Sequence, residues 1–138
     1  MPYVLSKLTP NLVVSNVERA VHFYCDVLGF SCAMTVPDEP PYAFSAVRSG
    51  GVEIFLNSAE SAGSEYPAFR GKAIGGTLTM FIDVADVRSV YDALKTQVKI
   101  VMPIEKKWYG VRDYVCGDRR LTRDWGLGIR NHEARAFC

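Results

Sequence analysis

A chain of 138 residues with 49% hydrophobic and 22% charged residues fits one compact globular domain and leaves little room for a second. Its formal net charge of +1 gives little electrostatic support for a role at nucleic acid or at a membrane surface. The apolar runs are far shorter than the roughly 20 residues of a membrane span, and the N-terminus lacks a signal-peptide pattern. We therefore expect a cytoplasmic protein whose partner is a small molecule or another protein.

The chain opens with a predicted strand and a helix. A strand beginning near Leu8 ends in the apolar run Leu12-Val13-Val14. Asn16 is a suitable N-cap, because its side chain can accept from a free backbone N–H, and Gly29 can adopt the left-handed conformation that ends a helix. Between these two residues, apolar side chains recur at helical spacing on one face: Val17, Ala20, Val21, Tyr24 and Leu28.

Three further strands are predicted in the first half of the chain. They span Ser31–Val36, Tyr42–Arg48 and Gly51–Asn57, and proline- or glycine-containing stretches separate them. The segment Ser58–Gly76, rich in Ser, Gly, Ala and charged residues, is expected to be a connecting loop.

The same order of elements returns in the second half. A strand is predicted at Thr77–Val84, a helix from Asp86 to about Val98, and strands near Ile100–Ile104, Val111–Cys116 and Leu121–Ile129. An offset of 70 residues brings similar residues of the two halves together, such as Leu12 with Ile82 and Asn16 with Asp86. This internal repeat predicts an α+β fold of two tandem βαβββ modules, about 7–58 and 75–130, whose sheets form a curved mixed sheet around a cavity within one domain.

Strand alternation assigns side chains to the two faces of each sheet. The apolar set expected against the helices is Leu12, Val14, Ile54, Leu56, Leu78, Met80, Ile82 and Val84. The set expected to face the cavity is Thr9, Asn11, Glu53, Phe55, Thr77, Thr79 and Phe81.

Several segments resemble one protein family. The helix ending Phe23-Tyr24-Cys25-Asp26-Val27-Leu28-Gly29-Phe30 resembles the F-Y-x-x-x-L-G-F pattern of glyoxalase and bleomycin-resistance-like proteins, the vicinal oxygen chelate superfamily. Leu8–Val14, Gly51–Leu56, Phe69–Thr79 and Trp108–Tyr114 extend the resemblance, which runs to about Asp118. It implies the paired βαβββ fold, but this superfamily hosts both metalloenzymes and proteins that only sequester an antibiotic.

The resemblance also implies where a metal would bind. Enzymes of the family place His, Gln or Glu on four cavity-facing strand positions, which fall here on Thr9, Phe55, Thr79 and Trp125. None of these residues is a plausible ligand, and a lone carboxylate at Glu53 makes a poor first-row metal site. We therefore expect no cofactor, with a divalent metal ion as the alternative.

A pocket of aromatic and small polar residues is expected in place of the metal. Aromatic faces bury planar or cationic ligands, while hydroxyl and amide groups fix their orientation. The simpler alternative is that each of these residues is ordinary core or cavity filling. The expected ligand-binding residues are Thr9, Asn11, Glu53, Phe55, Thr79, Phe81, Trp108, Tyr109 and Trp125.

No residue is assigned a catalytic role. The four cysteines contain no CxxC pair and are expected to be free thiols, and the sequence supplies no base beside Cys116 that would activate it. His22 is expected on the helix surface, and His132 lies in the divergent tail.

The chain departs from the family pattern after Asp118, where five arginines crowd the last twenty residues. This tail is either a divergent final strand or the product of a frameshifted gene end.

Three functions remain open on the sequence. The first is a metal-free binding protein, resembling antibiotic-sequestering proteins, that takes an aromatic or cationic compound as a homodimer. The second is a metal-dependent glyoxalase-like lyase or isomerase, or a thiol transferase. The third is a non-catalytic structural or regulatory module.

Overall fold

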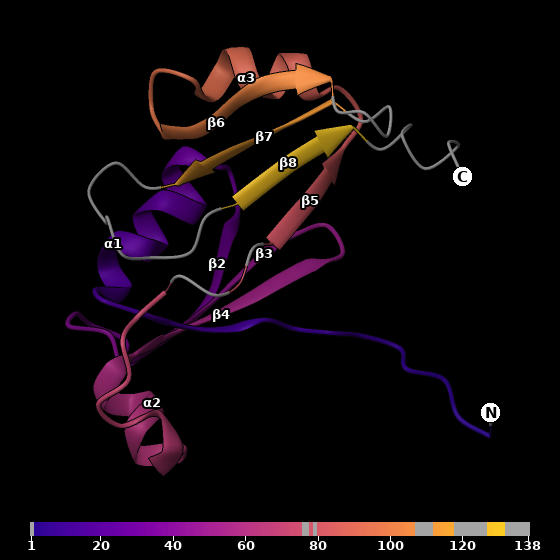
Figure 1. The fold of residues 1–138 in the computed structure, drawn as a ribbon. Helices are drawn as coiled ribbons and strands as arrows, with labels where there is room; N and C mark the ends of the chain where they lie inside the picture. Colours follow the sequence, from indigo (N-terminus) through magenta and orange to yellow (C-terminus); the bar gives the residue numbers. More distant parts are fainter. Residues whose placement is uncertain (1, 76–77, 79, 107–111, 118–126, 132–138) are drawn as a thin grey trace. The chain divides into compact units, whose positions relative to one another are not determined.

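The chain folds into two compact units, Met1–Ile74 and Gly75–Cys138, each built on a four-stranded mixed sheet (Figure 1). The computed structural model describes residues 2–75, 78, 80–106, 112–117 and 127–131. Strand order β1-β4-β3-β2 in the first sheet is repeated as β5-β8-β7-β6 in the second. The predicted α+β fold of two βαβββ modules is thus confirmed. How the two sheets enclose a cavity, and whether the modules make one domain, stay predictions.

The first sheet consists of β1 (Asn11–Val14), β2 (Ser31–Val36), β3 (Phe44–Ser49) and β4 (Val52–Ser58). Strand β1 runs parallel to β4, whereas β3 is antiparallel to both β4 and β2. The β3–β4 hairpin closes through Gly50-Gly51, since Ser49 pairs with Val52. Gly50 has φ +55°, which is the left-handed backbone that a two-residue hairpin turn requires.

The first helix begins and ends where the sequence predicts. Helix α1 (Val17–Val21) is capped by Asn16, whose Oδ1 accepts from the Arg19 N–H at 3.0 Å. It continues as a π-helix over His22–Val27, and the Leu28 N–H donates to the carbonyl of Phe23, five residues back, at 3.0 Å. Gly29 follows with φ +87° and ends the helix.

The core of the first module lies between α1 and one face of its sheet, as strand alternation predicts. Leu56 is 0% exposed, and its neighbours on the same face are almost as fully buried. The buried apolar residues of these elements include Leu12, Val14, Val17, Ala20, Phe23, Tyr24, Val47 and Ile54.

The segment after β4 is not the predicted loop. Helix α2 (Ala59–Glu65) starts there, and the Ser58 hydroxyl caps it by accepting from the Ser61 N–H at 3.1 Å. A 3₁₀ turn over Pro67–Phe69 follows. The prediction was wrong because Ser and Gly dominated the composition, although a serine directly after a strand is also a good N-cap.

The second module consists of β5 (Met80–Val84), α3 (Val87–Leu94), β6 (Lys99–Lys106), β7 (Arg112–Gly117) and β8 (Leu127–Asn131). Strand β5 runs parallel to β8, so the divergent tail supplies a final strand.

The N-cap of α3 confirms the internal repeat. Asp86 accepts from the N–H groups of Arg88 and Ser89 at 3.1 and 3.2 Å, in the role that Asn16 has in the first module. Helix α3 ends at Leu94, short of the predicted Val98, and Leu78 is exposed ahead of β5 rather than packed under a helix. In the described part of the chain, no helix has the length and apolar character to cross a membrane.

Candidate functional site

The first sheet has a second face, opposite α1, which we call the open face. Its register places side chains of neighbouring strands in rows, with Phe44 beside Asn57, Ala46 beside Phe55, and Arg48 beside Glu53. Asn11 of β1 lies beside Phe55. Met34 and Val36 of β2 complete the face beside Ala46 and Phe44.

Two aromatic rings meet at the middle of the open face. The rings of Phe44 and Phe55 are half-buried and pack edge to face, with centroids 5.2 Å apart and planes inclined at 62°. Met34, 53% exposed, and exposed Val36 extend this apolar surface toward the edge strand β2. A strand face that leaves such side chains in solvent has apolar area to cover with a ligand or a partner.

One end of the open face carries an ion cluster. The Lys7 ammonium donates to Glu53 Oε1 at 2.7 Å, and Arg48 Nε donates to Glu53 Oε2. Glu53 is only 8% exposed, whereas Lys7 and Arg48 are 56% and 61% exposed. The hydrogen bond from Lys7, followed by that from Arg48, holds the pKa of the Glu53 carboxyl below its ordinary value of 4.5.

The other end of the open face carries an amide pair. Asn57 Nδ2 donates to Asn11 Oδ1, and Asn57 Oδ1 accepts from the Ser61 hydroxyl at 3.4 Å. Asn57 is buried while Asn11 is exposed. The rings of Phe44 and Phe55 thus lie between a neutral polar end and a charged end.

Three of the residues predicted from the sequence come together here: Asn11, Glu53 and Phe55. Thr9 is half-buried just before β1, because the strand starts at Asn11 rather than near Leu8. Phe81 is an exposed residue of β5 in the second module. The other predicted site residues, Thr79, Trp108, Tyr109 and Trp125, lie outside the described residues.

The sequence interpretation missed several members of the face and its ion cluster, four of them aromatic or polar. Phe44 and Arg48 lie on β3, Asn57 lies on β4, and Lys7 reaches Glu53 from the segment before β1. The register of the Gly50-Gly51 hairpin would have identified the β3 residues, because it fixes which of them lie opposite Glu53 and Phe55. No local pattern marks Lys7, whose contact spans 46 residues of sequence.

The first module does not fit a family-type metal site. Phe55 has no donor atom, and Glu53, the nearest carboxylate on its strand, already has each of its oxygens paired with a cation. Among the described residues, no group of three or more His, Cys, Asp or Glu side chains could hold a metal ion. His22 is exposed on the helix surface as expected, where its Nδ1 lies 2.7 Å from Asp26 Oδ2.

Two free cysteines lie on the helix side of the first sheet, Cys25 in the π-helical segment and Cys32 in β2. Burial raises the pKa of the Cys25 thiol to about 11, and the nearby Cys32 and Asp26 add to the effect. At neutral pH this thiol is protonated, so Cys25 is a poor nucleophile.

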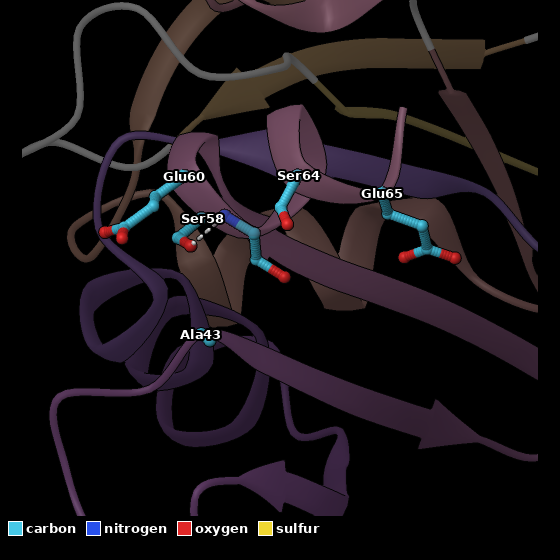
Figure 2. Close-up of a pocket in the computed structure, with 6 residues that line it drawn as sticks. Ala43, Ser58, Glu60, Ser64 and Glu65 are labelled. Carbon is cyan, nitrogen blue, oxygen red and sulfur yellow. Dashed lines mark hydrogen bonds between the residues drawn. The ribbon is translucent and has the colours of Figure 1, made fainter. Parts of the chain in front are cut away.

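A separate hollow of about 510 Å³ lies along α2, and none of the sequence-predicted site residues that the structure describes lines it. Its wall consists of Ala43, Ser58, Glu60, Ser61, Ser64 and Glu65. Figure 2 shows the Glu60 and Glu65 side chains pointing away from each other at the two ends of the helix. Its described lining residues include no aromatic ring and no cation, so they lack the apolar area by which small-molecule sites bury a ligand.

Comparison with known proteins gives a consistent result. The family model described as the glyoxalase/bleomycin resistance protein/dioxygenase superfamily matches residues 5–122. No curated protein matches the chain.

Three solved structures illustrate the similarity of fold. TioX from Micromonospora sp. is 21% identical, with 93% of this chain and 99% of that one covered at a TM-score of 0.71. A superfamily member from Sphaerobacter thermophilus is 19% identical, with 94% and 98% covered and a TM-score of 0.71. A family enzyme from Burkholderia phytofirmans is 18% identical, with 89% and 95% covered and a TM-score of 0.70.

Proposed function

Because the chain belongs to the glyoxalase/bleomycin resistance protein/dioxygenase superfamily, we propose that it is a small-molecule-binding protein that holds an aromatic compound on the open face. It acts by occupancy rather than turnover, and binding requires no metal. The observation that carries this proposal is the edge-to-face pair of Phe44 and Phe55, half-buried on the face opposite α1.

The composition of the open face supports binding of a flat ring system. Aromatic side chains prefer edge-to-face and offset-stacked partners, so a planar ligand can take the place of a third ring beside this pair. Met34 adds a flexible, polarizable contact at the β2 edge. The Asn11–Asn57 amide pair supplies hydrogen-bonding groups at one border of the rings.

The residues of the first module favour this proposal over a metal-dependent lyase, isomerase or thiol transferase. Phe55 and Thr9 stand at two of the four positions where family enzymes carry ligands, and the Glu53 carboxylate is engaged by Lys7 and Arg48. Metal analysis of protein purified without chelator, together with a thermal-shift screen of divalent ions, tests the choice. We expect no stoichiometric metal and no stabilisation, and a bound equivalent of metal would overturn the proposal.

Binding itself is tested with naphthalene-2-carboxamide, a neutral planar probe, followed by its fluorescence. We expect saturable binding to the wild-type chain that Phe55→Ala weakens about tenfold, since a stacking or edge contact and its buried area are lost. Leu28→Ala, a change on the opposite side of the sheet at the half-buried residue that follows the π-helical segment, is the control and should keep the affinity. Equal binding by wild type and Phe55→Ala would contradict the site.

We also propose that the protein works as a homodimer. In the described part of the chain, the edge strand β2 contains no charged residue and exposes Met34 and Val36. Uncharged, exposed edge strands are surfaces on which further strands or chains pack.

A further inference from the structure

The ion cluster at one end of the open face does not behave as a simple salt bridge. Two cations, Lys7 and Arg48, share one carboxylate, Glu53, so the cluster keeps one net positive charge. The carboxylate is 8% exposed while the two cations are more than half exposed. Solvent, or a ligand in its place, therefore meets the positive groups and not the negative one.

Within the described residues, the donors of the two cations are only partly used. The structure gives the Lys7 ammonium and the Arg48 guanidinium one hydrogen bond each to Glu53. An ammonium has three N–H donors and a guanidinium five, so both side chains retain donors for an incoming acceptor. Glu53 holds the two cations in place beforehand, which lowers the entropy lost when they bind an anion.

The cluster is also at the right spacing from the aromatic pair. Glu53 and Phe55 are two residues apart on β4, as are Arg48 and Ala46 on β3, and they share one face. Two strand residues span roughly 7 Å, so a group attached directly to a ring system beside Phe55 reaches the cluster. Two oxygens of a carboxylate match the geometry in which arginine donors bind anions.

We propose that the natural ligand class is a planar aromatic compound bearing an anionic group, with its rings beside Phe44 and Phe55 and its anion between Lys7 and Arg48. This inference rests on the proposed function and narrows it. The sequence left a cationic ligand open, but the excess positive charge on the open face favours the anionic class.

Three naphthalene probes of similar size, whose substituents carry different charges, test the inference: naphthalene-2-carboxylate, naphthalene-2-carboxamide and naphthalen-2-ylmethylammonium. We expect the carboxylate to bind about fivefold more tightly than the amide, because hydrogen bonds to a charged acceptor are stronger, and the ammonium to bind most weakly. The preference for the carboxylate should shrink as salt is raised from about 0.05 M to about 0.5 M, since partly exposed charges are screened.

Variants locate the effect on the two cations. Lys7→Gln and Arg48→Gln each leave one cation on Glu53, so each should reduce the preference for carboxylate over amide toward unity. Arg48→Lys should restore part of the preference. Arg19→Gln, an exposed arginine of α1 on the other side of the sheet, is the matched control and should leave all three affinities unchanged. Thermal unfolding of each variant establishes that it is folded.

The outcomes separate the two proposals. Equal affinities for all three probes, or a carboxylate preference that survives both Gln variants, would overturn the anionic ligand while leaving an aromatic binder standing. Absence of binding by all three would overturn both.

Discussion

Phe55 and Leu56 are consecutive residues of β4 whose side chains point to opposite faces of the first sheet. Leu56 is 0% exposed and lies in the core against α1, whereas Phe55 is half-buried on the open face. Replacing each by alanine therefore separates a core role from a binding role. For Leu56→Ala we expect a loss of about 2–5 kcal/mol in the free energy of unfolding, the range of a buried leucine that leaves a cavity.

Phe55→Ala should cost much less stability than its size suggests. The edge contact with Phe44 contributes about 0.5–1.5 kcal/mol, and the ring already has part of its surface in water, so a total of about 1–2 kcal/mol is expected. Urea unfolding followed by circular dichroism gives both values, and fluorescence titration with the naphthalene probe gives the affinities. If Phe55→Ala destabilised the protein as much as Leu56→Ala, the open face would be part of the hydrophobic core and not a surface for a ligand.

Three further predictions concern pH, helix capping and assembly. The pKa of Glu53 is lowered in the folded state, so its ion pairs stabilise the fold at pH values above the ordinary carboxyl pKa of 4.5, and this stabilisation is lost as pH falls through the lower pKa of the folded state. Glu53→Gln should flatten this part of the stability–pH profile. An unchanged profile would argue against the ion cluster. Asn16→Ala and Asp86→Ala should each lower stability by about 0.5–2 kcal/mol in thermal unfolding, because each removes an equivalent N-cap. If either change left stability unaltered, the two residues would not have equivalent capping roles. Light scattering after gel filtration should give twice the mass of one chain, with Met34→Lys shifting it toward the monomer, whereas a wild-type monomer would contradict the dimer.

The sequence predicted the fold because hydrophobic period, caps and turns agree with one another along the chain. Asn16 and Asp86 stand 70 residues apart and cap equivalent helices, so a comparison of the two halves was enough to expect two similar modules. The end of the first helix at Gly29 was predictable from the local sequence, because glycine readily adopts the positive φ that ends a helix. The π-helical turn over His22–Val27 was not, since its composition is also that of an ordinary α-helix.

The candidate site was only half predictable. Strand parity alone placed Asn11, Glu53 and Phe55 on one face, because side chains alternate along a strand. Assigning Phe44 and Arg48 required the register between strands, which the two-residue Gly50-Gly51 turn determines. The contact of Lys7 with Glu53 depends on the path of the irregular segment before β1, and no periodic pattern in the sequence predicts that path. The sequence marks Glu53 only as a lone carboxylate, and its ion pairs with Lys7 and Arg48 depend on the folded structure.

We propose above all that a planar aromatic anion binds on the open face of the first sheet. Amide chemical shifts recorded during titration with naphthalene-2-carboxylate test it most directly. We predict that the largest shifts fall on the strand residues that form the face, around Ala46, Phe55 and Arg48, with Arg19 of α1 unaffected. Shifts concentrated at Glu60 and Glu65 along the α2 hollow, with β3 and β4 unmoved, would contradict the claim.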